Sequence, residues 1–165
     1  MYDYITKELP ELISNKFEFS KSKIGIFGHS MGGGGAIQCA IKNDLYKSVS
    51  AFSPICSLHN STFAKDMFSN YLDNNLDELN TYDPLTLIKN SKKKFESIKI
   101  DVGLSDDFLK DLYIDDFINV CDEIGQKLLV AKHPGFDHGY YFINSFIEDH
   151  INYHVSILKN LGWLN

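Results

Sequence analysis

Residues 24–37 read IGIFGHSMGGGGAI, and this stretch decides the fold. Its first four residues form an apolar run that predicts a strand, and its last residues predict the start of a helix. Between them lies a G-x-S-x-G pattern with Ser30 at its centre, typical of a sharp strand-to-helix turn. Gly28 and Gly32 are expected to leave room for this turn. A serine so placed is open to a base on one side and to backbone N–H donors on the other, which a serine nucleophile requires.

Phosphate binding is the competing interpretation of a glycine-rich loop after a strand. A P-loop closes on Lys-Ser or Lys-Thr, whereas Gly35 is followed by Ala36 and Ile37. A dinucleotide fold requires an acidic residue about twenty positions after the glycines. Position 50 is serine, and residues 48–52 contain no acid. Both phosphate-binding interpretations are therefore disfavoured.

A serine nucleophile of this kind needs an acid and then a histidine further along the chain, each on a loop after a later strand. Residues 97–102 predict such a strand and are followed by Asp106 and Asp107. Residues 127–132 predict the next strand, and His138 lies on the glycine-bounded loop after it. The chain therefore supplies the expected groups in the expected order.

Position in the chain ranks the candidates for base and acid. His133 directly follows its strand and precedes a proline, so its ring has fewer ways to reach across the sheet edge, and His138 is favoured. Asp106 is favoured as the acid, while Asp107 and the strand residue Asp101 remain alternatives. The other histidines lie elsewhere: His29 inside the motif, His59 in an early polar loop, and His150 and His154 in the predicted last helix.

Helices and strands alternate along the chain. Helices are predicted over residues 2–16, from the turn to about 43, near 108–125 and from about 140 to 160, and strands over 24–27, 47–53, 97–102 and 127–132. This order predicts an α/β fold with a mostly parallel sheet and helices on both faces. Residues 57–92 are expected to form short helices over the site, and residues 1–165 to form a single domain. The aromatic residues Phe136, Tyr140, Tyr141, Phe142 and Phe146 are expected to pack in the core, and the alternative for Tyr140 and Tyr141, which lie next to His138 in the sequence, is to line the site.

Composition narrows the function classes. The chain has 165 residues, of which 44% are hydrophobic, and a net charge of −6, which disfavours nucleic-acid binding. Its one basic cluster, residues 92–94, is expected to be a solvated loop. Three cysteines give no disulfide framework and no C-x-x-C metal spacing, so a reducing compartment, the cytoplasm, is expected. No signal peptide or membrane-spanning segment is predicted.

Four stretches resemble the S-formylglutathione hydrolases, the esterase D group of the α/β-hydrolase superfamily. They are residues 1–10, 26–33, 46–56 and 135–143, which agree with the family in order and spacing. The resemblance implies that Ser30 is the nucleophile, His138 the base, Asp106 the orienting acid, and the Met31 N–H an oxyanion donor. It also implies hydrolysis of S-formylglutathione to formate and glutathione, and of small acyl esters, through an acyl-enzyme. No metal or cofactor is expected.

The same resemblance implies that the first strands of the family sheet, and the loop carrying a second oxyanion donor, precede the region this chain matches. The strand at residues 24–27 is then expected to lie at the sheet edge, where an apolar, uncharged strand favours pairing with another chain, a second copy included, or aggregation. The alternative hypothesis is therefore a catalytically impaired hydrolase fold that acts as a binding or assembly module.

Overall fold

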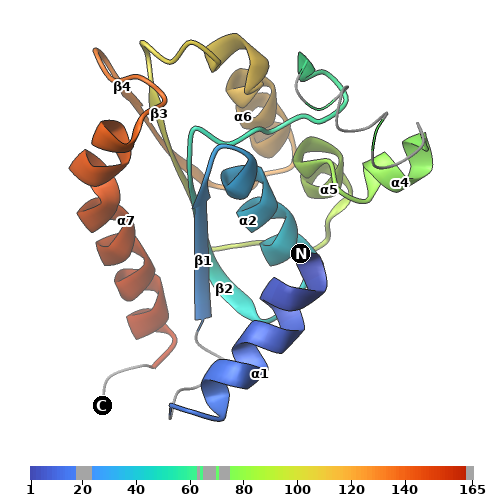
Figure 1. The fold of residues 1–165 in the computed structure, drawn as a ribbon, viewed down its shortest axis with the longest axis vertical. Helices are drawn as coiled ribbons and strands as arrows, with labels where there is room; N and C mark the ends of the chain where they lie inside the picture. The colour runs from blue at the N-terminus through green and yellow to red at the C-terminus, as the bar shows by residue number, and fades with distance from the viewer. Residues whose placement is uncertain (18–23, 63, 65–69, 71–74, 163–165) are drawn as a thin grey trace.

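The computed structural model describes residues 1–17, 24–62, 64, 70 and 75–162. Its centre is a parallel sheet of four strands in the order β1-β2-β3-β4 (Figure 1). The strands are β1 (Ile24–His29), β2 (Tyr46–Phe52), β3 (Ile98–Gly103) and β4 (Leu128–His133). Each lies within a few residues of its predicted position, and the predicted α/β architecture is confirmed.

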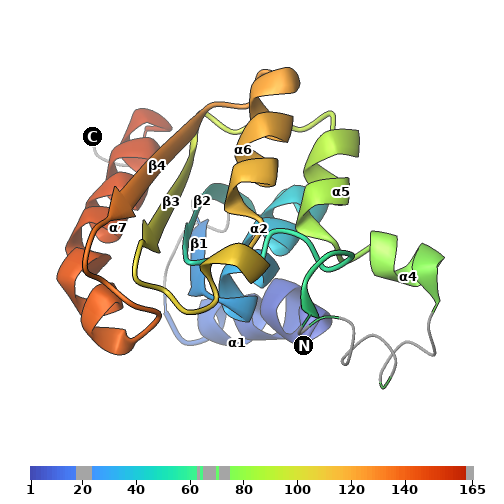
Figure 2. The same ribbon diagram turned by 90° about the horizontal axis from the view of Figure 1, so that it is seen from above.

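Helices cover both faces of this sheet, as predicted. The helices α2 (Met31–Lys42), α5 (Pro84–Asn90) and α6 (Ile114–Glu123) lie on one face, and α7 (Tyr140–Asn160) lies on the other (Figure 2). None of the described helices is long and apolar enough to span a bilayer. Because β3 and β4 are adjacent and parallel, the loops that follow them emerge at the same end of the sheet.

The alternation of side chains along β3 explains how both faces are filled. Ile98, Ile100 and Val102 are fully buried in the apolar core, where Phe117 of α6 also packs. The intervening Asp101 is equally buried, but it lies on the face covered by α7, where it approaches His150. A strand buried on both faces therefore carries an apolar row and a polar row.

Two predicted helices are interrupted. The N-terminal one consists of a π-helical turn (η1, Tyr4–Glu8) followed by α1 (Leu9–Ser14). The one predicted near residues 108–125 is a short 3-10 turn (η2, Leu109–Asp111) followed by α6, because Tyr113 adopts a left-handed conformation with φ 55°. The hydrophobic spacing located both segments but did not reveal the breaks.

Short helices do occur in the region of residues 57–92. α4 (Leu76–Asn80) begins after Asn75, whose side chain accepts the Glu78 N–H, and α5 begins after Asp83, whose carboxylate accepts the Thr86 N–H. These are ordinary N-caps. The rest of this predicted cap, residues 63, 65–69 and 71–74, lies outside the described residues.

Two expectations about side chains are wrong in part. Lys92 and Lys94 are exposed in a loop, as predicted, whereas Lys93 is only partly exposed. The Lys93 ammonium donates to the carbonyls of Ala40 and Asn43, where it caps the C-terminus of α2. Tyr140 and Tyr141, predicted in the core, are 84% and 76% exposed at the start of α7. Tyr141 stacks on Phe136 and is otherwise largely exposed, so the apolar stripe of α7 begins one residue later.

Candidate active site

Ser30 lies at a sharp turn between β1 and α2. Its backbone has φ 58° and ψ −122°, which is unfavourable for an L residue, and such strain typically costs about 1–3 kcal/mol. Hydrogen bonds to the end of β2 hold the turn. The Ser30 N–H donates to the Phe52 carbonyl at 2.9 Å, and the Ser30 carbonyl accepts the Ile55 N–H at 3.1 Å. The strained conformation is thus maintained by the neighbouring strand.

The two glycines of the motif differ in their surroundings. A Cβ on Gly28 would collide with the carbonyl oxygen of Gly32, so position 28 accepts glycine alone. A Cβ on Gly32 would meet nothing within 4 Å. The expectation that both glycines make room for the turn therefore fits Gly28, whereas Gly32 faces open space.

Asp106 and His138 come together at the ends of β3 and β4. The Nδ1–H of His138 donates to Oδ2 of Asp106 at 2.7 Å, and the other carboxylate oxygen accepts the Phe108 N–H at 2.8 Å. The Asp106 side chain is fully buried, while that of His138 is partly exposed. A carboxylate can only accept, so this bond keeps the proton on Nδ1 and leaves Nε2 as the basic nitrogen.

Ser30 and His138 line one small pocket of about 350 Å³, together with Met31, Ile55 and Phe108. Met31 is the first residue of α2, so its N–H is one of the donors that a helix N-terminus leaves unpaired. Such donors favour negative charge. The pocket therefore combines a hydroxyl, a base and a backbone donor. Among the described residues, no group of three or more His, Cys, Asp or Glu side chains is arranged to hold a metal ion.

His29, which position had excluded as the base, lies against His138. The two ring centroids are 4.4 Å apart, and the ring of Phe108 packs edge-on against His138 at 5.0 Å. Burial lowers the pKa of His29, and the charge of His138 lowers it further. The neutral form of His29 is therefore favoured where its ring lies against His138. Its place next to Ser30 in the sequence is the signal that could have identified it.

The alternative base and acids are positioned elsewhere. His133 donates through Nε2 to Asp101 Oδ2 at 2.9 Å, so these two residues pair with each other. Asp101 is also within 2.7 Å of the Lys99 ammonium and 3.4 Å of His150 Nε2. Burial alone would raise the pKa of Asp101, but its contacts with His150, Lys99 and His133 together lower it to about 2. Asp107 is exposed and takes no part in either pair.

His150 and His154 form a buried polar layer with β2. The Ser50 hydroxyl lies 2.8 Å from His150 Nδ1 and 2.8 Å from His154 Nε2, and the Ser48 hydroxyl lies 2.6 Å from His154 Nδ1. Sequence reasoning missed this layer. The spacing of the two histidines by one helical turn, opposite alternate serines in a strand, was the available signal.

Comparisons with known proteins show which family the chain belongs to. The Esterase family model, described as "Putative esterase", matches residues 1–153. The chain is 44% identical over 162 residues to the S-formylglutathione hydrolase of Arabidopsis thaliana and 42% identical to that of Bos taurus. Each alignment covers 96% of this chain but 57% of the relative, so the chain spans little more than half the length of these relatives.

Solved structures give the same result. The structure of an S-formylglutathione hydrolase from Agrobacterium tumefaciens superposes with a TM-score of 0.90 at 36% identity, covering 96% of this chain and 57% of that one. A fluorophosphonate-binding serine hydrolase, FphF of Staphylococcus aureus, gives a TM-score of 0.76 at 27% identity, with 93% and 63% covered. The chain therefore belongs to the Esterase family and has the fold of the α/β-hydrolases.

Proposed function

We propose that this chain carries the chemistry of a serine hydrolase, with Ser30 as nucleophile, His138 as general base and Asp106 as orienting acid. The observation that carries the proposal is the hydrogen bond between Asp106 and His138 beside the pocket that contains Ser30. It leaves the Nε2 lone pair of His138 available to a serine hydroxyl. The strained turn at Ser30 supports the same role, because strain of this kind is characteristic of functional sites.

The reaction proceeds in two steps, transfer of the acyl group to Ser30 and hydrolysis of the resulting acyl-enzyme. His138 Nε2 accepts the proton of the Ser30 hydroxyl as Oγ bonds to the carbonyl carbon of an ester or thioester. The Met31 N–H donates to the oxyanion, and His138 returns the proton to the departing alkoxide or thiolate as its bond to the carbonyl carbon breaks. Water then loses a proton to His138 Nε2 and attacks the acyl carbon; the bond from that carbon to Ser30 Oγ breaks, and His138 returns the proton to Oγ, which releases the acid and restores both residues. Asp106 keeps the imidazole in the reactive tautomer and stabilises its charged form.

We propose S-formylglutathione as the natural substrate, with formate and glutathione as products and small acyl esters as further substrates. The names of the relatives from Arabidopsis thaliana and Bos taurus support this choice. The pocket at Ser30 supports a small acyl group, because its volume of about 350 Å³ is at the low end for ligand sites.

The decisive experiment follows hydrolysis of S-formylglutathione and of a small acyl ester by the purified chain. Ser30→Ala is expected to abolish turnover, whereas Asp107→Asn, which alters an exposed carboxylate next to the proposed acid, is expected to leave it unchanged. Turnover that survives Ser30→Ala would contradict the proposal. Turnover of the ester alone would preserve the mechanism and reject the substrate.

Two expectations stay proposals alongside this function. The shared core of α2, α6 and the central strands supports the interpretation that residues 1–165 form one domain. Three free, buried cysteines, Cys39, Cys56 and Cys121, support a reducing compartment such as the cytoplasm.

The second candidate function is the catalytically impaired binding or assembly module. It is favoured by the exposed edge of β1, a strand that contains none of the three proposed catalytic residues. This edge lies beside a large apolar pocket. A folded chain that hydrolyses neither substrate and assembles through this edge would favour the module over the enzyme.

A further inference from the structure

The small pocket that contains Ser30 and His138 has a wall built from two segments that are far apart in the sequence. One is the chain after β2, which contributes Ile55, and the other is the segment around η2. An apolar wall suits the hydrocarbon part of an acyl group better than a polar peptide such as glutathione. Ile55 and Leu112 are buried apolar side chains of this wall. The η2 segment contributes Phe108, Asp111 and Leu112.

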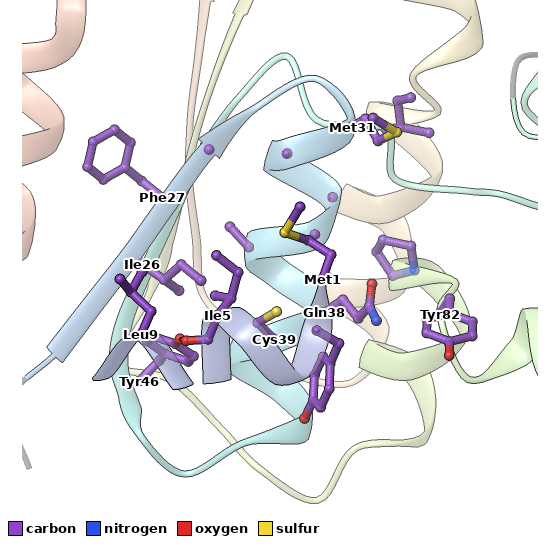
Figure 3. Close-up of a pocket in the computed structure, with 18 of the residues that line it drawn as sticks. Met1, Ile5, Leu9, Ile26, Phe27, Met31, Gln38, Cys39, Tyr46 and Tyr82 are labelled. Atoms are coloured by element: carbon purple, nitrogen blue, oxygen red, sulfur yellow. The ribbon is translucent and has the colours of Figure 1, made fainter. Parts of the chain in front are cut away.

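A second, larger pocket of about 1170 Å³ lies between the N-terminal helix, β1 and α2 (Figure 3). Neither Ser30 nor His138 lines this larger pocket, whereas both line the small one. An acyl group attached to Ser30 therefore contacts the wall of the small pocket. Whatever fixes that wall decides which acyl groups fit.

Asp111 joins the two segments of this wall. Its Oδ2 accepts the Ser61 hydroxyl at 2.7 Å, and its Oδ1 accepts the Thr62 N–H at 2.8 Å. Ser61 is fully buried and belongs to the chain that continues from Ile55. Hydrogen bonds to a carboxylate are stronger than those between neutral groups. Asp111 therefore lines the pocket and also holds the loop that leads away from the other half of the wall.

Two neighbouring hydrogen bonds extend the same contact. The Cys56 N–H donates to the Leu112 carbonyl at 2.8 Å, and the Tyr113 hydroxyl donates to the Asn60 carbonyl at 3.1 Å. The two segments lie side by side (Figure 2). Tyr113 has φ 55°, and strain of this kind is characteristic of functional sites. The loop is thus held at its start and again at residues 60–62, which fixes the shape of the wall.

We propose that Asp111 is a positioning residue that sets the acyl specificity of the site: its hydrogen bonds to Ser61 and Thr62 fix the wall of the small pocket and limit the acyl group to a short chain. The proposal rests on the proposed function, in which Ser30 carries the acyl group. In an apolar pocket of fixed shape, one methylene group changes kcat/KM by roughly 10–200-fold. Loss of the two hydrogen bonds loosens the wall and is expected to admit longer acyl chains.

Two substitutions of Asp111 separate positioning from charge. A hydroxyl can donate or accept, so in Asp111→Asn the amide nitrogen donates to Ser61 Oγ while the amide oxygen accepts the Thr62 N–H. This variant keeps both hydrogen bonds and removes the negative charge. Asp111→Ala removes the charge and both hydrogen bonds. A positioning role therefore predicts that the asparagine variant behaves like the unaltered chain and the alanine variant does not.

The test measures kcat/KM for p-nitrophenyl acetate and p-nitrophenyl hexanoate, which share a leaving group and differ in acyl length. The unaltered chain is expected to prefer the acetate. Asp111→Ala is expected to reduce this preference at least about tenfold, and Asp111→Asn to keep it within about threefold. Ser61→Ala alters a residue outside the pocket lining and is expected to shift the preference in the same direction by a smaller factor. Asp115→Ala, at an exposed ion pair with Lys132, is the matched control.

Hydrogen exchange tests the contact without any turnover. The Thr62 N–H, measured by NMR in a Ser30→Ala background, is expected to exchange at least about tenfold faster in Asp111→Ala and at an unchanged rate in Asp111→Asn. Equal rates in the alanine variant and its parent would overturn the proposal. Circular dichroism and thermal unfolding of each variant show that the chain is folded.

The kinetic outcomes distinguish failure of this proposal from failure of the proposed function. No turnover of either ester by the unaltered chain would reject the proposed function, and with it a role of Asp111 in specificity. Turnover that Ser30→Ala abolishes, with an acyl preference that folded Asp111→Ala leaves unchanged, would reject the role of Asp111 alone. An equal loss on both esters, or the same shift in Asp111→Asn as in Asp111→Ala, would also overturn positioning of the acyl wall.

Discussion

The imidazole of His138 donates through Nδ1 to the fully buried carboxylate of Asp106 at 2.7 Å, although the two residues are 32 positions apart. The register of β3 with β4, in which Gly103 lies opposite His133, brings their loops together. Asp106→Asn is expected to lower kcat by about 10³–10⁴-fold, because an amide no longer selects the reactive tautomer. Ester hydrolysis measures this loss, and a decrease of less than tenfold would reject Asp106 as the orienting acid.

The strain at Ser30 predicts a gain in stability when the whole side chain, including Cβ, is removed. Ser30→Gly is expected to raise the free energy of unfolding by about 1–2 kcal/mol, because glycine adopts φ 58° without strain. Urea denaturation measures the change. Ser30→Ala retains the Cβ and is the control, expected to have unfolding stability close to that of the unaltered chain. Equal stability of the two variants would show that the turn stores no strain.

The contact between His29 and His138 predicts that the His29 ring supports activity through its packing and not through a charge. His29→Ala removes one wall beside the base and is expected to reduce kcat about tenfold through looser positioning. His29→Phe keeps an aromatic ring at this place and is expected to retain most activity. Because the pKa of His29 is lowered and the ring is neutral near pH 7, the pH profile of His29→Phe should match that of the unaltered chain. A shifted profile would assign His29 a proton-transfer role.

Buried His154 predicts a loss of stability in mild acid. Burial, with a smaller effect from the charge of His150, lowers its pKa to about 4, whereas the unfolded chain binds this proton near pH 6.5. The unfolded state therefore gains the proton first. The stabilisation is complete above about pH 7 and is lost as the pH falls from 6.5 towards 4, by about 3 kcal/mol in all and about 2 kcal/mol by pH 5.

His154→Gln isolates this effect, because glutamine does not titrate while it can still hydrogen-bond to Ser48 and Ser50. Urea denaturation at pH 7.5 and pH 5.0 gives the change in unfolding free energy for each protein. The unaltered chain is expected to lose more stability than the variant over this interval. The same loss in both would mean that His154 is protonated in the fold.

The sequence was sufficient to place the strands and helices because their hydrophobic periods are clear. Alternation at residues 97–102 located β3, and the glycine-rich turn located both β1 and α2. The interruption at Tyr113 had no such signal, since a left-handed tyrosine is fixed by tertiary contacts rather than by local propensity. The placement of the Lys93 ammonium at the C-terminus of α2 likewise depends on how two distant segments pack.

The candidate site was predictable in part for the same reason. Chain order and loop position favoured Ser30, Asp106 and His138, which the structure brings to one end of the sheet. Position in the chain favoured His138 over His133, and the structure gives the physical reason, because His133 pairs with Asp101. Two further features depend on strand register, which residue types alone do not specify. They are the contact of His29 with His138 and the layer that His150 and His154 of α7 form against β2.

The most direct test of the central claim is labelling with a fluorophosphonate probe, read by intact mass. The account predicts one adduct on the folded chain, located at Ser30, no adduct on Ser30→Ala, and labelling at least about a hundredfold slower on His138→Gln. A folded chain that takes up no probe, or that is labelled equally after Ser30→Ala, would contradict the claim that Ser30 is a nucleophile activated by His138.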